Sequence, residues 1–137
     1  MRELPIKIQT IVYRNDDGIK VLLIKRNLED GGFWQTVTGT LELNESIIES
    51  RARELEEEIG IKEANFSEEI HRFSWEKKDY TVVELVYSAE VFTDKVILSS
   101  EHTEYCWLPI PEAIKKVDKQ NIKNSLIKFS ENFSESN

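Results

Sequence analysis

Three glutamates on one side of a predicted helix form the first group in this sequence that could do chemistry. Glu54, Glu57 and Glu58 fall within an arc of about 100° when residues 46–59 are placed on a helix at about 100° per residue. Carboxylate oxygens are the hard ligands that Mg²⁺ and Mn²⁺ prefer. Three like charges on adjacent turns repel one another, and a divalent cation removes that repulsion. The alternative is a solvated acidic face, which is the ordinary interpretation of a glutamate run.

The segment that carries these glutamates has its own start and stop signals. Ser46 followed by Glu49 forms a capping box, so we expect the helix to begin near Ser46. Gly60 suits the left-handed conformation that ends a helix. The apolar residues form a separate stripe opposite the carboxylates, which we expect to be buried and which comprises Ile48, Ala52, Leu55 and Ile59.

A longer pattern encloses the helix. Residues 39–61 read GTLELNESIIESRARELEEEIGI, which follows G-x5-E-x7-R-E-U-x-E-E-x-G-U at every fixed position, with U a bulky aliphatic residue. A chance match is on the order of 10⁻⁸ per starting position at ordinary residue frequencies. The stretch resembles the signature of the Nudix hydrolases, which hydrolyse diphosphates linked to another group. The resemblance implies an α+β fold of the Nudix type, an α/β/α sandwich with a mixed sheet and a loop–helix–loop.

The Nudix-like signature at residues 39–61, or Nudix box, supplies candidate metal ligands and a candidate base. Glu57 and Glu58 offer oxygen ligands for Mg²⁺, with Mn²⁺ as a substitute, and Glu54 can share a metal or hold its water. Water would attack a phosphorus atom while the metal screens the phosphate charge. A carboxylate would take the proton of that water. Glu54 and Glu58 both remain candidates for this base, since the family varies in where its base resides.

The remaining box residues are expected to shape the loop before the helix. Arg53 points elsewhere on the helix, and the resemblance gives it an ion pair that orients a loop carboxylate, for which Glu42 and Glu45 are the candidates. Gly39 allows a close backbone approach to the metal, and by resemblance its carbonyl is a ligand. We count Arg53 with the catalytic residues on the same basis.

Two flanking stretches resemble one branch of the family, the bacterial dihydroneopterin triphosphate pyrophosphatases, also called dATP pyrophosphohydrolases. Residues 33–42 (FWQTVTGTLE) are similar to its FWQ-S/T-VTG-x-x-E stretch, and residues 101–108 to its E-H-x-x-Y-x-W-L segment. In that branch the glutamate before the histidine is a metal ligand, which here is Glu101. The branch implies that a triphosphate is split into a monophosphate and pyrophosphate.

These stretches also supply candidate substrate-binding residues: Trp34, Gln35, Thr38, Arg26 and His102. Trp34 could be a core residue, but its place just before the metal loop favours a stacking role, since an aromatic face suits a pterin or purine ring. Arg26 could be a surface charge, although we favour contact with substrate phosphates. His102 could be structural or could lie beside the site. Thr38 stands where many Nudix boxes have a glycine.

The rest of the chain predicts one α+β domain over residues 1–130. Besides two hairpins, we expect a short strand at 33–37 and another at 104–108. Pro109 and Pro111 should then end the regular pattern before a last helix. The expected hairpins are 6–13 with 19–25 and 69–75 with 80–92, the last helix spans 121–130, and the polar C-terminal tail is 131–137.

Composition limits the partners and the compartment. The formal net charge is −8, and no basic cluster is longer than Lys77-Lys78 or Lys115-Lys116. This argues against binding to nucleic-acid polymers or an anionic membrane through phosphate contacts. Cys106 is the single cysteine, and no apolar run approaches the ~20 residues that span a bilayer. A cytoplasmic protein acting on a small phosphate compound is therefore expected.

Other functions stay open at this stage. A Nudix hydrolase could act instead on ADP-ribose, a dinucleoside polyphosphate or an oxidised nucleotide. The connection at residues 75–80 is short, whereas the pterin branch implies a longer loop with arginine or histidine near the substrate. A binding module that senses a nucleotide without cleaving it is the alternative from another class, although its box would usually be eroded. The sequence leaves the oligomeric state undetermined.

Overall fold

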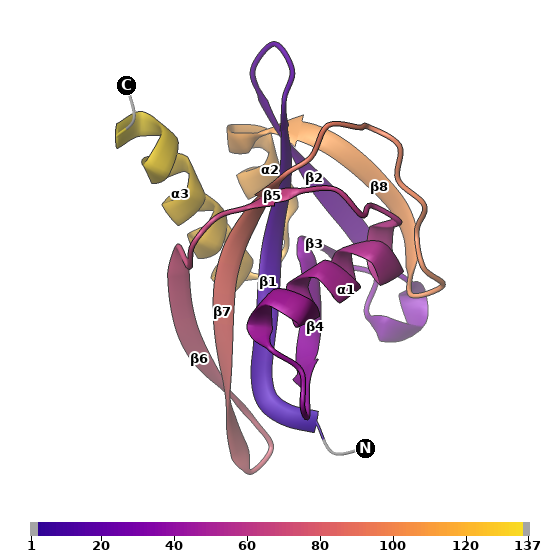
Figure 1. Ribbon diagram of the computed structural model, residues 1–137, viewed down its shortest axis with the longest axis vertical. Helices are drawn as coiled ribbons and strands as arrows, with labels where there is room; N and C mark the ends of the chain where they lie inside the picture. Colours follow the sequence, from indigo (N-terminus) through magenta and orange to yellow (C-terminus); the bar gives the residue numbers. More distant parts are fainter. Residues whose placement is uncertain (1–2, 136–137) are drawn as a thin grey trace.

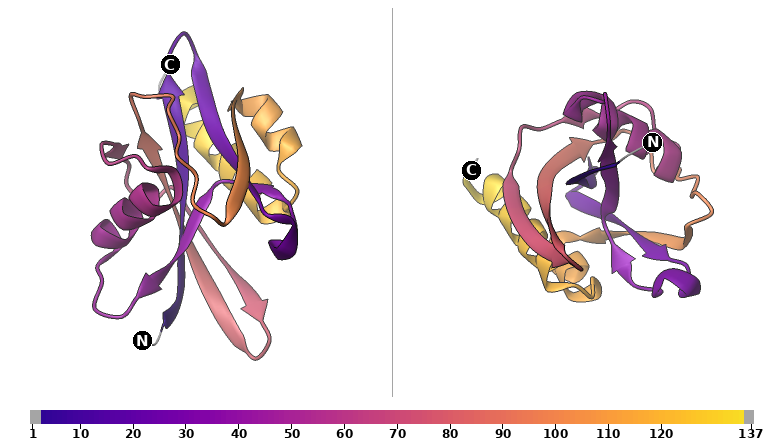
Figure 2. Two further views of the ribbon diagram at one scale, coloured as in Figure 1. Left: turned by 90° about the vertical axis from the view of Figure 1, so that its right-hand side faces the viewer. Right: turned by 90° about the horizontal axis from the view of Figure 1, so that it is seen from below.

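The computed structural model describes residues 3–135 as a mixed sheet of eight strands with helices on both faces (Figures 1 and 2). Each predicted strand is present, and the segment 33–37 divides into two. The strands are β1 (Glu3–Asn15), β2 (Ile19–Arg26), β3 (Trp34–Gln35), β4 (Val37–Glu42), β5 (Asn65–Phe66), β6 (His71–Lys77), β7 (Tyr80–Glu90) and β8 (His102–Pro109). The helices are α1 (Ile47–Ile59), α2 (Ile110–Lys116) and α3 (Gln120–Glu135), and η1 (Leu28–Asp30) is a single 3-10 turn.

Strand β1 is the centre of the sheet. It pairs parallel with β7 and antiparallel with β2 and β4. Successive residues of β1 face opposite sides of the sheet. Val12 packs in the cluster that contains Leu55 of α1, and Ile11 packs in the cluster that contains Leu126 of α3. The α+β fold with helices on both sides of a mixed sheet is thus confirmed. Among residues 3–135, no helix is long and apolar enough to span a bilayer.

The C-terminal part differs from the sequence prediction. Pro109 and Pro111 do not end the regular structure, because Pro109 is the N-cap of α2 and Pro111 lies in its first turn, where a missing N–H breaks no helical hydrogen bond. Helix α3 continues past Ser130 to Glu135. The ring of Phe133 packs against Tyr13 and Phe129, which explains why part of the expected polar tail is helical. Residues 136–137 of that tail lie outside the described residues.

Helix α1 begins and ends as its sequence predicts, but it buries a different face. Ser46 and Glu49 form the capping box, and Gly60 has the left-handed conformation (φ +71°). The expected apolar stripe is wrong in its first half, since Ile48 is 68% exposed and Ala52 is exposed. The buried face instead contains Ser50, Glu54, Leu55, Glu58 and Ile59. Two carboxylates of the box are therefore turned toward the protein interior.

Candidate active site

Gly39 and Glu54 bring strand β4 and helix α1 into close contact. A Cβ atom at Gly39 would lie 2.0 Å from Cδ of Glu54. The absent side chain therefore leaves the space that the Glu54 carboxyl group occupies. In the same loop Asn44 adopts a left-handed conformation (φ +70°), which asparagine tolerates better than most residues. The glycine of the box is thus explained by a direct side-chain contact.

This contact leads to a prediction for Gly39→Ala. The methyl group would push the Glu54 carboxylate away, and a displaced reactive group should lower kcat/KM by about 10- to 100-fold. The fold should tolerate the change at a cost below about 1 kcal/mol, because the far end of a glutamate can rotate to another rotamer. Steady-state kinetics and thermal melting of the same preparation test both parts. Wild-type activity in this variant would contradict the role given to the contact.

Arg53 binds four carboxylates of the loop and the helix. Its guanidinium donates to both oxygens of Glu45, with Nη2 3.0 Å from Oε1, and its Nη1 lies 2.9 Å from Oε1 of Glu54 and 3.1 Å from Oε2 of Glu57. Glu42 lies farther away, with Oε1 3.9 Å from Nη1. Arg53 therefore faces the carboxylates, contrary to the expectation that it points elsewhere. Its hydrogen bonds are the main reason that the pKa of Glu45 is lowered to about 2.

Glu54 carries a carboxyl group whose ionisation the folded protein disfavours. Burial raises its pKa to about 7, Arg53 opposes the shift, and the neighbouring carboxylates Glu58 and Glu57 add to it. A buried carboxyl with too little nearby positive charge behaves in this way. A cation placed beside Glu54 would favour its ionised form.

Glu58 is held from the opposite side by His102. Nδ1 of His102 lies 3.2 Å from Oε2 of Glu58, and Nε2 lies 3.1 Å from the amide nitrogen of Gln35. Because that amide nitrogen is a donor, Nε2 accepts, and the ring proton is assigned to Nδ1, facing the carboxylate. Burial disfavours ionisation of Glu58, but its contacts with His102, Glu101 and Ser99 outweigh burial and lower its pKa. His102 therefore lies beside the site, buried with Glu58.

The donor atoms suit a hard divalent cation. Within residues 3–135, no three Asp, Glu, His or Cys side chains enclose a cation position as they stand. The side chains that could contribute are nevertheless oxygen donors on one helical segment, joined by Glu101, whose carboxylate lies near Glu58. The close approach of the Glu54 carboxyl group to the Gly39 backbone and the raised pKa of Glu54 both fit a cation at this position. The residues that could hold it are Glu54, Glu57, Glu58, Glu101 and the Gly39 carbonyl.

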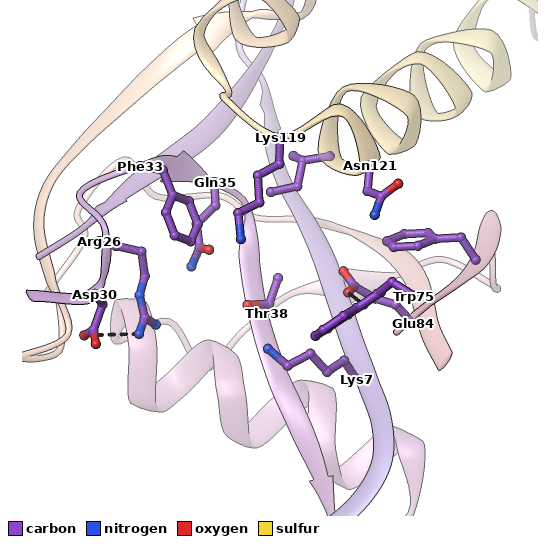
Figure 3. Close-up of a pocket in the computed structure, with 12 residues that line it drawn as sticks. Lys7, Arg26, Asp30, Phe33, Gln35, Thr38, Trp75, Glu84, Lys119 and Asn121 are labelled. Atoms are coloured by element: carbon purple, nitrogen blue, oxygen red, sulfur yellow. Dashed lines mark hydrogen bonds and ion pairs between the residues drawn. The ribbon is translucent and has the colours of Figure 1, made fainter. Parts of the chain in front are cut away.

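A cavity of about 440 Å³ is lined by residues of the sheet and of the start of α3, and none of the box carboxylates is among its lining residues. Figure 3 shows its aromatic and charged side chains pointing inward from several elements. Three predicted residues line it, namely Arg26, Gln35 and Thr38. Gln35 links the cavity to Glu58 through His102, and Nη1 of Arg26 lies 4.0 Å from Oε1 of Glu101. These contacts connect two residues of the cavity wall, Gln35 and Arg26, with the carboxylates Glu58 and Glu101.

Trp34 is not among the residues that line this cavity, and its predicted stacking role stays a prediction. Its ring packs with the cluster under α2 and α3 and is covered by the Lys116 ammonium, 4.5 Å from the ring centroid. Side chains alternate along this short strand, so Gln35 lines the cavity, as does Phe33 just before the strand. Sequence reasoning missed the lining residues that come from distant segments, which are Lys7, Asp30, Phe73, Trp75, Glu84, Lys119, Asn121 and Ile122.

The fold and the candidate site together define an α+β domain with helix-borne carboxylates and a cavity lined by charged and aromatic side chains. The family model of the NUDIX domain matches residues 5–130. The chain therefore belongs to the Nudix family, and the domain is a Nudix pyrophosphohydrolase acting on nucleotide-like diphosphates.

Relatives with known names differ in substrate. A dihydroneopterin triphosphate diphosphatase of Haemophilus influenzae is 27% identical over 136 residues, covering 89% of this chain and 85% of the relative. An octanoyltransferase of Myxococcus xanthus is 34% identical over 112 residues, covering 78% of this chain but only 31% of the relative. A solved C. elegans Ap4A hydrolase has a TM-score of 0.84 at 24% identity, covering 94% of this chain and 97% of that one. This last likeness shows the fold alone.

Proposed function

We propose that this chain hydrolyses a nucleoside or pterin triphosphate, such as dihydroneopterin triphosphate or dATP, to the monophosphate and pyrophosphate, with Mg²⁺ as its metal. The observation that carries the proposal is the chain of side-chain contacts between the cavity wall and the box, in which Gln35 contacts His102 and His102 contacts Glu58. A ring in the cavity would thus have its phosphates near the box. The matching branch residues at 33–42 and 101–108 and the H. influenzae relative support a triphosphate.

The protein's residues would divide the work between binding and proton transfer. Arg26 lies between the cavity and Glu101 and is suited to a phosphate oxygen. The carboxylates and the Gly39 carbonyl would hold Mg²⁺, which would screen the charge of the phosphates. Glu54 or Glu58 accepts the proton of the attacking water. Arg53 would hold the loop against helix α1 through its hydrogen bonds to the Glu45 carboxylate.

A substrate panel tests this function. Purified protein with Mg²⁺, and separately with Mn²⁺, is offered dihydroneopterin triphosphate, the dNTPs, ADP-ribose and diadenosine polyphosphates, and the products are identified. Triphosphates should give a monophosphate and pyrophosphate. If ADP-ribose gives two monophosphates, or if only the diadenosine compounds are cleaved, the proposed substrate is wrong but the assignment as a hydrolase stands. If nothing is cleaved with either metal, the proposed hydrolysis is wrong, and a module that binds a nucleotide without cleaving it becomes the favoured function.

A further prediction concerns Glu101→Gln, on the loop before β8. We expect kcat/KM to fall by about 10-fold or more, because the variant removes a charge from the proposed metal site while keeping the size of the side chain. The concentration of Mg²⁺ that gives half-maximal activity should rise. The matched control is Glu104→Gln, which removes an exposed carboxylate on β8 that pairs only with Lys25 among the described ion pairs. Equal activity in both variants would remove Glu101 from the site.

A further inference from the structure

Glu84 is a buried carboxylate in the wall of the cavity, and neither the box nor the proposed hydrolysis uses it. It lies on β7 with 6% of its surface exposed and faces the cavity (Figure 3). Gln9 donates to its Oε2 at 2.9 Å, and the Trp75 indole N–H donates to its Oε1 at 3.1 Å. Both donors are neutral, so they fix the orientation of the carboxylate without cancelling its charge.

The carboxylate retains unused acceptor capacity. Two carboxylate oxygens provide about four lone-pair sites, and Gln9 and Trp75 each use one, on different oxygens. Among residues 3–135 no third side-chain donor contacts this carboxylate, so one site on each oxygen is available to a ligand. Lys7 is the register partner of Glu84 across the parallel β1–β7 pair, lines the same cavity and interacts electrostatically with it. The wall thus presents a fixed two-point acceptor with a cationic donor beside it.

We propose that Glu84 selects the substrate ring by accepting hydrogen bonds from the adjacent N–H groups of a 2-amino-4-oxopyrimidine edge, which guanine and dihydropterin share. This inference rests on the proposed function, whose substrate class it narrows. Lys7 donates to the neighbouring ring carbonyl, and Trp75 and Phe73 provide aromatic walls. Adenine has an acceptor nitrogen where guanine has its ring N–H. Its lone pair would face a lone pair of the Glu84 carboxylate, and no hydrogen bond would form.

The test compares Glu84→Gln with wild type on four triphosphates: dihydroneopterin triphosphate, dGTP, dITP and dATP. Wild type should prefer dihydroneopterin triphosphate and dGTP over dATP, with dITP between them because it lacks the 2-amino donor. A two-point hydrogen-bonded edge typically discriminates by about 10- to 100-fold, and the variant should lose most of that preference. The dGTP and dihydroneopterin triphosphate arms then show which of the two rings fits better.

The matched control is Glu90→Gln, the same change on the same strand but outside the cavity lining. It should keep the wild-type preference. If Glu84 only ties β1, β6 and β7 together, Glu84→Gln will lower stability and slow all four substrates equally. An unchanged dGTP-to-dATP ratio in that variant overturns the proposal, as does a wild-type preference for dATP.

Binding of the product nucleotides separates this inference from the proposed function. Isothermal titration calorimetry with dGMP and dAMP needs no turnover. If wild type cleaves no triphosphate but binds dGMP more tightly than dAMP, and Glu84→Gln removes the difference, the proposed reaction is wrong and the role of Glu84 stands. If triphosphates are cleaved but dGMP and dAMP bind equally, the reaction stands and the role of Glu84 is wrong.

Discussion

Glu58→Gln should lower kcat/KM by about 100-fold or more while leaving the fold intact. The amide keeps the shape of the carboxyl and an oxygen that can accept from His102 and Ser99, which contact Oε2 in the wild type at 3.2 and 3.3 Å. It loses the negative charge, and with it both a candidate oxygen ligand and a candidate base. The same loss should weaken Mg²⁺ binding, which calorimetry measures apart from turnover.

The control for this variant is Glu56→Gln, two residues earlier on α1. Glu56 is exposed and pairs with Lys62, away from the cavity, so its replacement should leave kinetics and metal binding unchanged. Near-normal turnover in Glu58→Gln, with the control behaving normally, would remove Glu58 from both the metal site and the proton transfer.

The helix and its box could be predicted from sequence because their signals are local. The Ser46–Glu49 capping box, Gly60 at the C-terminus and the box spacing each depend on residues within one short segment. Runs rich in apolar and β-branched residues likewise located β1, β2 and β7. Arg53 was given a partner in the preceding loop for the same reason, and the structure shows Glu45 in that place.

The cavity could not be predicted because its residues come from segments far apart in the chain. Lys7 and Glu84 become neighbours only through the parallel pairing of β1 with β7. Trp75 faces the cavity from a hairpin whose short turn had counted against a pterin, since we expected the substrate contacts to come from a loop. In the structure the strand β6 itself supplies aromatic side chains. Trp34 and Phe33, adjacent in sequence, differ in role only through the direction in which each side chain points.

The buried face of α1 shows a different limit. A hydrophobic pattern assumes that apolar side chains decide which side of a helix packs inward. Here Glu54 and Glu58 are buried while Ile48 is exposed, so the packing of α1 places charge in the interior at a cost to stability. Such a conflict between local pattern and packing is expected where a site has a function.

That cost leads to the second large prediction, for Glu54→Gln. Activity should fall by about 100-fold or more because a candidate ligand and base is lost. Stability of the metal-free protein should increase. Burial raises the pKa of Glu54 to about 7 from 4.5, so the folded protein favours the protonated form and loses stability as pH rises from about 4.5 to 7. A neutral amide avoids this loss while keeping an acceptor for Arg53, which donates to Oε1 at 2.9 Å.

Urea unfolding in EDTA at pH 5 and pH 8 measures the effect. At pH 8 we expect the variant to be more stable than wild type by about 1–2 kcal/mol, less than the full pKa difference implies because an amide only approximates the protonated carboxyl group. At pH 5 the gap should nearly close, since the wild-type carboxyl is then mostly protonated in the folded state. Adding Mg²⁺ should stabilise wild type more than the variant by mass action. A variant that is less stable than wild type at pH 8 would mean that Arg53 compensates fully for the burial of Glu54.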